Sequence, residues 1–242
     1  MSSSKFATAA DVQRALRALA SPKRAAGSAW FFKCGKGEYG EGDVFIGVTV
    51  PQQRAVAKRF GGLPLAQLER LLRSKVHEDR LTALLILVHQ VTKSRGEALG
   101  KKARRLYLKN VKYVNNWDLV DSSAEYMLGG DLTLLEKLSA SKHLWSRRIA
   151  MIATFHHIKL GSARETLNIA ERLVGDDHDL IHKAVGWMLR EVGKRVGRAP
   201  LRGFLRRHAA TMPRTMLRYA IEHLPKPERV KWLGAAQRRA RW

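Results

Sequence analysis

Apolar residues recur at three- and four-residue intervals along most of this chain. One such stripe consists of Leu81, Leu84, Leu85 and Val88. This spacing places side chains on one face of an α-helix, and frequent glycine and proline residues mark where helices end. The pattern predicts about eleven or twelve helices joined by short connections. Strand-like sequence is confined to residues 44–48, which is too short to build a sheet.

Five of the expected helical segments align with one another without gaps over nine residues. Their second residues, 27 to 41 residues apart, are Arg80, Asp121, Arg148, Lys183 and Arg214. Helix pairs with periods in this range stack because none can bury its apolar stripe alone. We therefore predict an all-α fold, an α-solenoid or superhelix of HEAT-like helical repeats with a concave basic groove. A compact bundle with accidental periodicity remains the alternative, since the spacings are unequal.

No linker divides the chain, so we expect one domain over residues 1–242, with residues 237–242 as a frayed basic tail. The single cysteine, Cys34, cannot form an intrachain disulfide, which favours a reducing compartment. The N-terminal residues lack the apolar core of a signal peptide. The longest apolar run, residues 81–88, is far shorter than a membrane span. These features predict a cytoplasmic protein with no membrane partner.

The charge of the chain indicates a polyanionic partner. There are 45 Lys and Arg residues against 21 Asp and Glu residues, which gives a formal charge of +24. Such an excess is typical of nucleic-acid binders. Four of the five aligned positions are cationic, although the helix dipole favours anions near helix starts. A column of cations placed against that preference suggests contacts with phosphates. A charged surface that serves only solubility is the alternative.

One acid, Asp121, interrupts the basic column, and Trp117 lies one helical turn before it. The two side chains share a face of a helix that Asn115 or Asn116 opens. Trp187 lies one turn after Lys183 and so belongs to the same face as the column. Two tryptophans and a carboxylate would suit a cationic group, through cation–π attraction and ion pairing.

Simpler roles remain open for the same residues. Each tryptophan can be a packing anchor, and Asp121 can form a salt bridge with Arg148. His178 and His182 have the spacing of a zinc-binding helix, but no third ligand accompanies them, so we expect no metal. The chain has no phosphate loop or dinucleotide fingerprint, and we expect no cofactor.

Three motifs, taken together, resemble the AlkD-type DNA alkylation-repair glycosylases, which are HEAT-like repeat DNA glycosylases. They are Trp117-Asp118-Leu119-Val120-Asp121, Trp145-Ser146-Arg147-Arg148 and Ala184-Val185-Gly186-Trp187-Met188-Leu189-Arg190-Glu191. The N-terminal segment of that family is similar to Phe45-Ile46-Gly47-Val48 followed by Pro51, Arg54 and Ala57-Lys58. The resemblance spans residues 30–235 and implies a superhelix of HEAT-like repeats. The segment 31–42 is longer than expected, so the family's N-terminal aromatic contact is left open among Trp30, Phe31, Phe32 and Tyr39.

The resemblance implies that Asp121, Trp117 and Trp187 are catalytic and that Arg148 contacts the DNA backbone. The other expected DNA contacts are Arg147, Arg80, Lys183, Arg190, Arg214 and Arg218. The implied activity is monofunctional base excision repair, in which N3- and N7-alkylated purines are released from duplex DNA without base flipping. The implied protein is a monomeric hydrolase that needs no metal and no small-molecule cofactor.

Two other functions fit parts of the sequence. A non-catalytic HEAT-repeat protein that binds bent or branched DNA would also carry a basic concave surface, since fold does not fix function. A scaffold for acidic proteins or structured RNA would fit the charge but not the tryptophan–carboxylate pair. Asp121 argues against a pure DNA binder, because a carboxylate among phosphates weakens binding.

Overall fold

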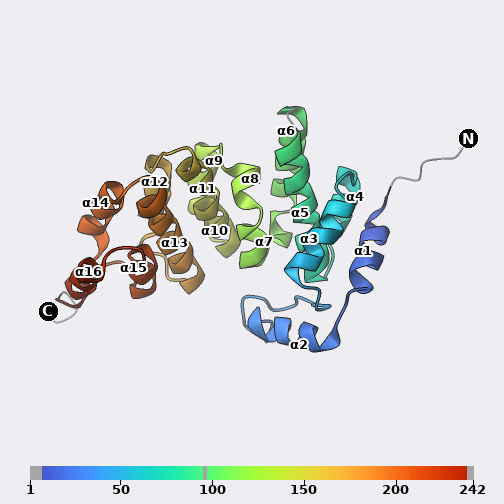
Figure 1. The fold of residues 1–242 in the computed structure, drawn as a ribbon, viewed down its shortest axis with the longest axis horizontal. Helices are drawn as coiled ribbons and strands as arrows, with labels where there is room; N and C mark the ends of the chain where they lie inside the picture. Colours follow the sequence, from blue (N-terminus) through green and yellow to red (C-terminus); the bar gives the residue numbers. More distant parts are fainter. Residues whose placement is uncertain (1–6, 95–96, 239–242) are drawn as a thin grey trace, which may run out of the picture. The chain divides into compact units, whose positions relative to one another are not determined.

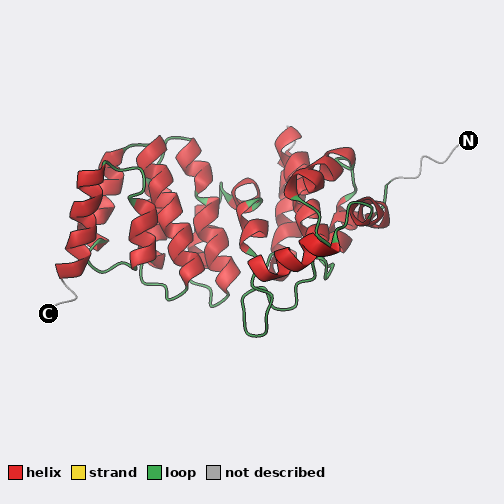
Figure 2. Cartoon of the chain, turned by 60° about the horizontal axis from the view of Figure 1, so that its bottom comes forward, coloured by secondary structure: helices red, strands yellow, loops and turns green. Residues whose placement is uncertain are grey.

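The computed structural model describes residues 7–94 and 97–238. Within these residues the chain is helical and contains no strand, as Figure 2 shows. The strand-like residues 44–48 form a single isolated bridge, in which Val44 pairs with Val76. The predicted all-α fold of helical repeats is thereby confirmed. The last helix ends at Arg238, so it includes the first two residues of the expected tail, whereas residues 239–242 lie outside the described residues.

The chain divides into two compact units, residues 1–127 and 128–242, and each is described by itself. The first unit contains α1 (Ala9–Arg17), α2 (Pro22–Phe31), α3 (Val50–Arg59), α4 (Leu65–Leu72), α5 (His77–Lys93), α6 (Glu97–Lys109), the 3-10 helix η1 (Val111–Tyr113), α7 (Trp117–Asp121) and most of α8 (Ala124–Leu128). The central helix is α5, which packs against α1, α3, α4, α6 and α7 (Figure 1). Its buried residues include Leu81, Leu84 and Leu87.

The second unit contains α9 (Leu132–Ser139), α10 (Leu144–Ala153), α11 (Phe155–Lys159), α12 (Arg164–Leu173), α13 (Asp179–Arg195), α14 (Arg198–His208), α15 (Arg214–Ala220) and α16 (Lys226–Arg238). Here α13 is central and packs against α10, α11, α12, α14 and α15. Gly186 of α13 permits the close approach of α15, because a Cβ atom there would lie 2.5 Å from the Met216 carbonyl oxygen. Each unit is thus built around one long buried helix.

The described residues form sixteen α-helices, more than the sequence predicted. The difference arises where one apolar stripe continues through two short helices. Ser122 and Ser123 separate α7 from α8, and the Ser123 hydroxyl donates to the Leu119 carbonyl at 2.6 Å. Thr154 separates α10 from α11, and its hydroxyl donates to the Met151 carbonyl at 2.7 Å. Such side-chain hydrogen bonds compete with the backbone hydrogen bonds of a helix and can interrupt it, while the spacing of the apolar residues stays the same.

Three helices begin with the same contact, which we call the helix-start latch. The fourth residue of the helix bonds the backbone carbonyl six residues before it. Arg80 donates to Ser74 at 2.9 Å, Arg147 donates to Ser141 at 3.1 Å, and the His182 ring contacts Asp176. The residue before each of these helices is extended, with ψ between 119° and 125°. The latch therefore fixes the angle at which a connection enters its helix.

The latch also corrects the register of the sequence alignment. Asp121, Arg148 and Lys183 are each the fifth residue of their helices, as the alignment requires. Arg80, however, is a fourth residue and corresponds to Arg147. Arg214 is the first residue of α15, and the fifth residue there is Arg218. The column of equivalent positions consequently contains neither Arg80 nor Arg214.

Candidate active site

Trp117 and Asp121 are the first and last residues of α7. Asn116 precedes the helix in an extended conformation, and its side-chain oxygen accepts a hydrogen bond from the Trp117 amide at 2.8 Å. Leu119 and Val120 are buried and anchor the helix in the first unit. Both Trp117 and Asp121 remain partly exposed. A short helix with a buried middle thus presents an indole and a carboxylate one turn apart.

The Trp117 indole rests on a group of aromatic rings. The Phe32 ring stacks on it, with centroids 5.1 Å apart and planes 24° apart. Phe31 meets it edge-on at 6.0 Å. Phe32 in turn stacks on Phe45 at 5.0 Å. The indole is therefore held by aromatic packing that the segment 31–45 provides, and these stacked and edge-on ring contacts favour one orientation.

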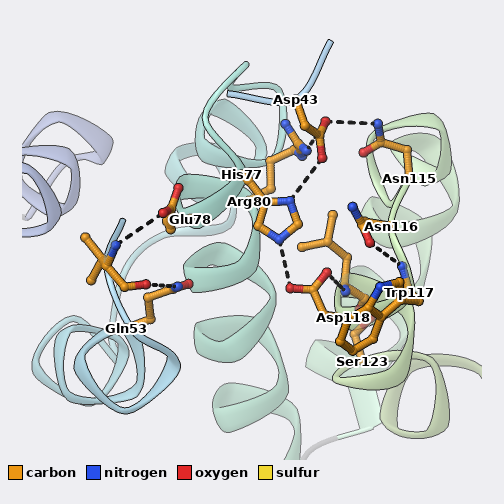
Figure 3. A network of polar contacts seen from close by, with 12 residues as sticks. Asp43, Gln53, His77, Glu78, Arg80, Asn115, Asn116, Trp117, Asp118 and Ser123 are labelled. Atoms are coloured by element: carbon orange, nitrogen blue, oxygen red, sulfur yellow. Dashed lines mark hydrogen bonds and ion pairs between the residues drawn. The ribbon is translucent and has the colours of Figure 1, made fainter. Parts of the chain in front are cut away.

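The aromatic group lies over a buried polar cluster, the His77 cluster, which consists of Asp43, His77, Arg80 and Asp118. Figure 3 shows the His77 ring between the two carboxylates. Nδ1 lies 3.0 Å from Asp43 and Nε2 lies 2.8 Å from Asp118. Arg80 donates to the other oxygen of Asp43 at 2.7 Å. The cluster joins the loop before α3, the start of α5 and the start of α7.

The segment that carries these rings is held by Glu78, whose side chain is buried. Its Oε1 accepts hydrogen bonds from the amides of Ile46, Gly47 and Val48 at 3.1, 2.7 and 3.2 Å. Gly47 has a φ of +77°, and a Cβ atom there would lie 2.3 Å from the Ser21 carbonyl oxygen. Glu78 and Gly47 thus fasten the loop beside the start of α2, although α2 itself has no buried residue.

Tyr107 of α6 lies within the electrostatic reach of Asp121. Burial raises the pKa of the Tyr107 hydroxyl well above its usual value, and the negative charge of Asp121 raises it further. The hydroxyl is 3.2 Å from that of Ser123, which follows α7. Tyr107 is therefore a neutral phenol beneath the helix and does not add negative charge beside Asp121.

In the second unit, Trp187 is a partly exposed residue of α13, one turn after Lys183. Arg148 is only 5% exposed and donates to the Leu180 carbonyl at 2.5 Å. The meeting of Trp187 and Arg148 with Trp117 and Asp121 in one cleft stays a prediction.

The expected DNA-contacting cations differ in how much of their side chains is available. Arg80 is the clear correction: its side chain is 4% exposed and bonded to Asp43 and to two loop carbonyls, so it is a structural cation. Arg147 is mostly buried and pairs with Asp176 at 2.6 Å. Arg190 pairs with Glu191 and Glu222. Arg148 is buried, as described above. The expected contacts that retain substantial exposure are Lys183, Arg214 and Arg218.

The described residues contain no group of three His, Cys, Asp or Glu side chains that could hold a metal ion. His178 immediately precedes α13, and its ring caps the helix by accepting a hydrogen bond from the Leu180 amide at 3.1 Å. No helix within the described part of the chain is both long and apolar enough to span a membrane.

Comparison with known proteins identifies the family of this chain. A family model described as "DNA alkylation repair enzyme" matches residues 12–224, which is most of the chain. The chain belongs to the DNA alkylation repair enzyme family. Membership supports a role in DNA repair, with DNA as the partner. The resemblance noted from the tryptophan–carboxylate motifs is thereby confirmed.

A solved structure shares the fold of this repair protein. It is described as a predicted DNA alkylation repair enzyme from Enterococcus faecalis and has a TM-score of 0.66 and 18% sequence identity. The similarity covers 86% of this chain and 97% of that chain. At this identity it shows the fold alone. No curated protein matches this sequence.

Sequence reasoning missed the residues that hold the site together. Neither the His77 cluster nor Glu78 was expected, although one signal was present. Residues 77–80 read His-Glu-Asp-Arg at the start of an otherwise apolar helix, and all four are buried. A run of four polar residues that continues directly into a core helix can indicate an interior polar network as well as a solvated face.

Proposed function

We propose that this repair protein is a monofunctional DNA glycosylase, which hydrolyses the N-glycosidic bond of cationic N3- and N7-alkylpurines in duplex DNA without flipping the base. The observation that carries the proposal is the pair formed by Trp117 and Asp121. On α7, the Trp117 indole, which packs on other aromatic rings, and the Asp121 carboxylate one turn away are both partly exposed. The chain that carries them belongs to a DNA alkylation repair family.

This substrate can be cleaved by a site that contains few catalytic groups. A purine alkylated at N3 or N7 carries a positive charge and leaves as a neutral base, so the leaving group needs no general acid. As the bond breaks, positive charge develops on the deoxyribose, as in other glycosidic cleavages. Groups that stabilise this charge more strongly in the transition state than in the ground state accelerate the step.

Asp121 is suited to that role, because a fixed carboxylate attracts the charge that develops on the sugar. It also orients the attacking water. The faces of Trp117 and Trp187 add cation–π attraction, on the order of 1–2 kcal/mol each. The aromatic support beneath Trp117 keeps its face in one place, so little reorganisation is needed when the charge appears. The three motifs that contain Trp117, Trp145 and Trp187 include no lysine, so we propose hydrolysis and not Schiff-base chemistry.

The DNA contacts follow from side-chain exposure. In the second unit, the basic residues that we propose as phosphate contacts are Lys183, Arg214 and Arg218. The side chain of Arg148 is more deeply buried than these three. Trp30 and Phe31, exposed by 76% and 56%, are the candidates for the N-terminal aromatic contact, since Phe32 lies beneath Trp117. We propose a monomeric, cytoplasmic enzyme that acts on alkylated duplex DNA.

The experiment that tests this function measures base release and duplex binding on the same methylated duplex. For Asp121→Asn we expect excision to fall by about a hundredfold or more, as for other groups that stabilise transition-state charge. Binding should be unchanged or tighter, because a carboxylate that repels phosphates has lost its charge. Asp177→Asn, a change at an exposed acid of the second unit, should alter neither quantity.

Two outcomes would contradict the proposal in different ways. If the wild-type protein releases no alkylated base, the non-catalytic DNA-binding function is the better account. If Asp121→Asn loses binding and excision in parallel, Asp121 is a structural residue and the proposed stabilisation of charge is wrong. Loss of excision alone supports the proposed role.

A further inference from the structure

His77 lies between two carboxylates, and this geometry determines its protonation. Each ring nitrogen faces a carboxylate oxygen, at 3.0 Å for Asp43 and 2.8 Å for Asp118. An ionised carboxylate only accepts hydrogen bonds, so both nitrogens must donate and the ring is an imidazolium. With Arg80, the cluster then holds two positive and two negative charges. Balanced charges of this kind are the condition under which ionised groups are tolerated in a protein interior.

The ring reaches the candidate active site by two routes. Asp118 directly follows Trp117 in α7, so the bond from Nε2 holds the first turn of that helix (Figure 3). Phe32 provides the second route, because its ring packs against His77 at 5.2 Å and against Trp117 at 5.1 Å. Through Asp43 the same imidazolium also holds the loop that follows Phe32. The residue is 1% exposed and cannot itself meet DNA.

We propose that His77, held as a cation between Asp43 and Asp118, is a positioning residue that sets the Trp117 indole and the Asp121 helix for base excision. The inference rests on the proposed glycosylase function. It adds a residue outside the tryptophan–carboxylate motifs, and it predicts a dependence on pH that the alkylated substrate alone would not produce.

Loss of the His77 proton would break the arrangement. A neutral imidazole has one donor and one acceptor, so one nitrogen lone pair would face a carboxylate, and the cluster would keep an uncompensated negative charge. The charged groups that face the ring are Asp43 from the loop, Asp118 from α7 and Arg80 from its own helix; Phe32 and Phe45 complete its surroundings.

The sign of the pH effect follows from these contacts. Burial lowers the pKa of His77, but its hydrogen bonds to Asp118 and Asp43 outweigh burial, and the pKa lies above the ordinary value of 6.5. A group whose pKa is raised on folding stabilises the protein fully below its unfolded pKa, and this contribution is lost as the pH rises through the folded pKa. The hydrogen bonds by which His77 holds α7, which we call the His77 clamp, are therefore complete below pH 6.5 and are lost as the pH rises through the raised pKa of His77.

The test uses the whole chain and a duplex that contains 7-methylguanine. Single-turnover release of the base is followed from about pH 6, below the unfolded pKa of a histidine, to alkaline pH for the wild type, for His77→Gln and for the double variant with His77→Gln and Asp118→Asn. A glutamine side chain can donate to Asp43 and accept from an amide that replaces Asp118, so the double variant retains a clamp that does not titrate. His89→Gln, on the same helix, is the matched control.

We expect His77→Gln to release base roughly ten- to hundredfold more slowly at about pH 6, where wild-type His77 is protonated; this is the size of effect that follows small displacements of catalytic groups. Duplex affinity should stay within about twofold, because His77 is buried. The ratio of wild-type to double-variant rates should fall as the pH rises, since the ratio cancels any titration of the lesion. Its midpoint should coincide with the titration of His77 followed by imidazole nitrogen NMR.

Three results would overturn the proposal: a His77 nitrogen without a proton at about pH 6, below the unfolded pKa, a rate ratio that stays flat while His77 titrates, or wild-type rates in His77→Gln. A wild-type protein that releases no base refutes the glycosylase function instead. The clamp is then upheld if the protection factor of the Leu119 amide, which removes the intrinsic rise of exchange with pH, falls over the His77 titration. It is refuted if this protection factor does not change.

Discussion

Replacing Glu78 by glutamine should loosen the loop that carries the aromatic support of Trp117. The side chains have the same shape, so the substitution mainly removes a charge. The Oε1 atom accepts from the amides of Ile46, Gly47 and Val48, and Oε2 lies 3.1 Å from the Ile46 amide. In the variant, the glutamine NH₂ group would place a donor where one of these oxygens now accepts.

The magnitude follows from the number and type of these bonds. A hydrogen bond to a charged group contributes about 1.5–3 kcal/mol, and one between neutral groups about 0.5–1.5 kcal/mol. Three amides that exchange a charged acceptor for a neutral one should therefore lose roughly 2–4 kcal/mol in total. Since about 1.4 kcal/mol corresponds to a tenfold change in an equilibrium constant, local opening of the loop should become roughly 30- to 1000-fold more frequent.

Hydrogen exchange at the amides of Ile46, Gly47 and Val48 measures this opening directly, because exchange reports the free energy of local unfolding. The matched control is Glu97→Gln, at an exposed acid that pairs with Lys101 on the surface of α6. Exposed pairs contribute little, so the control should leave the three amides unchanged. If the Glu78 variant retains their protection within about threefold, the carboxylate does not hold the loop and the argument fails.

Two further predictions concern the second unit. Gly186→Ala should destabilise this unit by about 1–3 kcal/mol in urea unfolding, because the new Cβ atom would lie 2.5 Å from both the Met216 carbonyl oxygen and the Tyr219 Cβ atom. The control is Gly175→Ala, where the new Cβ atom meets nothing within 4 Å. Equal stability of the two variants would contradict the packing argument. Duplex affinity should fall steeply with salt, and Arg218→Ala should reduce the slope of log K against log salt by about 0.9 if this exposed arginine contacts one phosphate; an unchanged slope would remove Arg218 from the interface.

Local patterns predicted the helices and the pairing of Trp117 with Asp121, because both depend on spacing within one or two turns. The same patterns failed for Arg80. A cation near a helix start looks the same in sequence whether it meets solvent or a buried acid. Its counter-ion, Asp43, lies 37 residues earlier in a loop, and only the folded chain brings the two together.

The His77 cluster escaped prediction for the same reason. Asp43 and Asp118 lie 34 and 41 residues from His77, on opposite sides of it in the sequence. Hydrophobic periodicity carries no information on such distant polar pairs. The register error between Arg80 and Arg147 is of another kind: a gapless alignment can match cations that differ by one position, and the true equivalence appears only once helix starts are known.

The helix-start latch has a consequence for how sequences of this fold can change. Its acceptor is a backbone carbonyl, so the side chains of the preceding connection are free to vary while the contact persists. Its reach is six residues in each of the three cases, from Arg80, Arg147 and His182. A connection can therefore be lengthened upstream of those six residues at little structural penalty. A single insertion inside them would break the hydrogen bond of the fourth helix residue, and the angle at which the chain enters the helix would no longer be fixed.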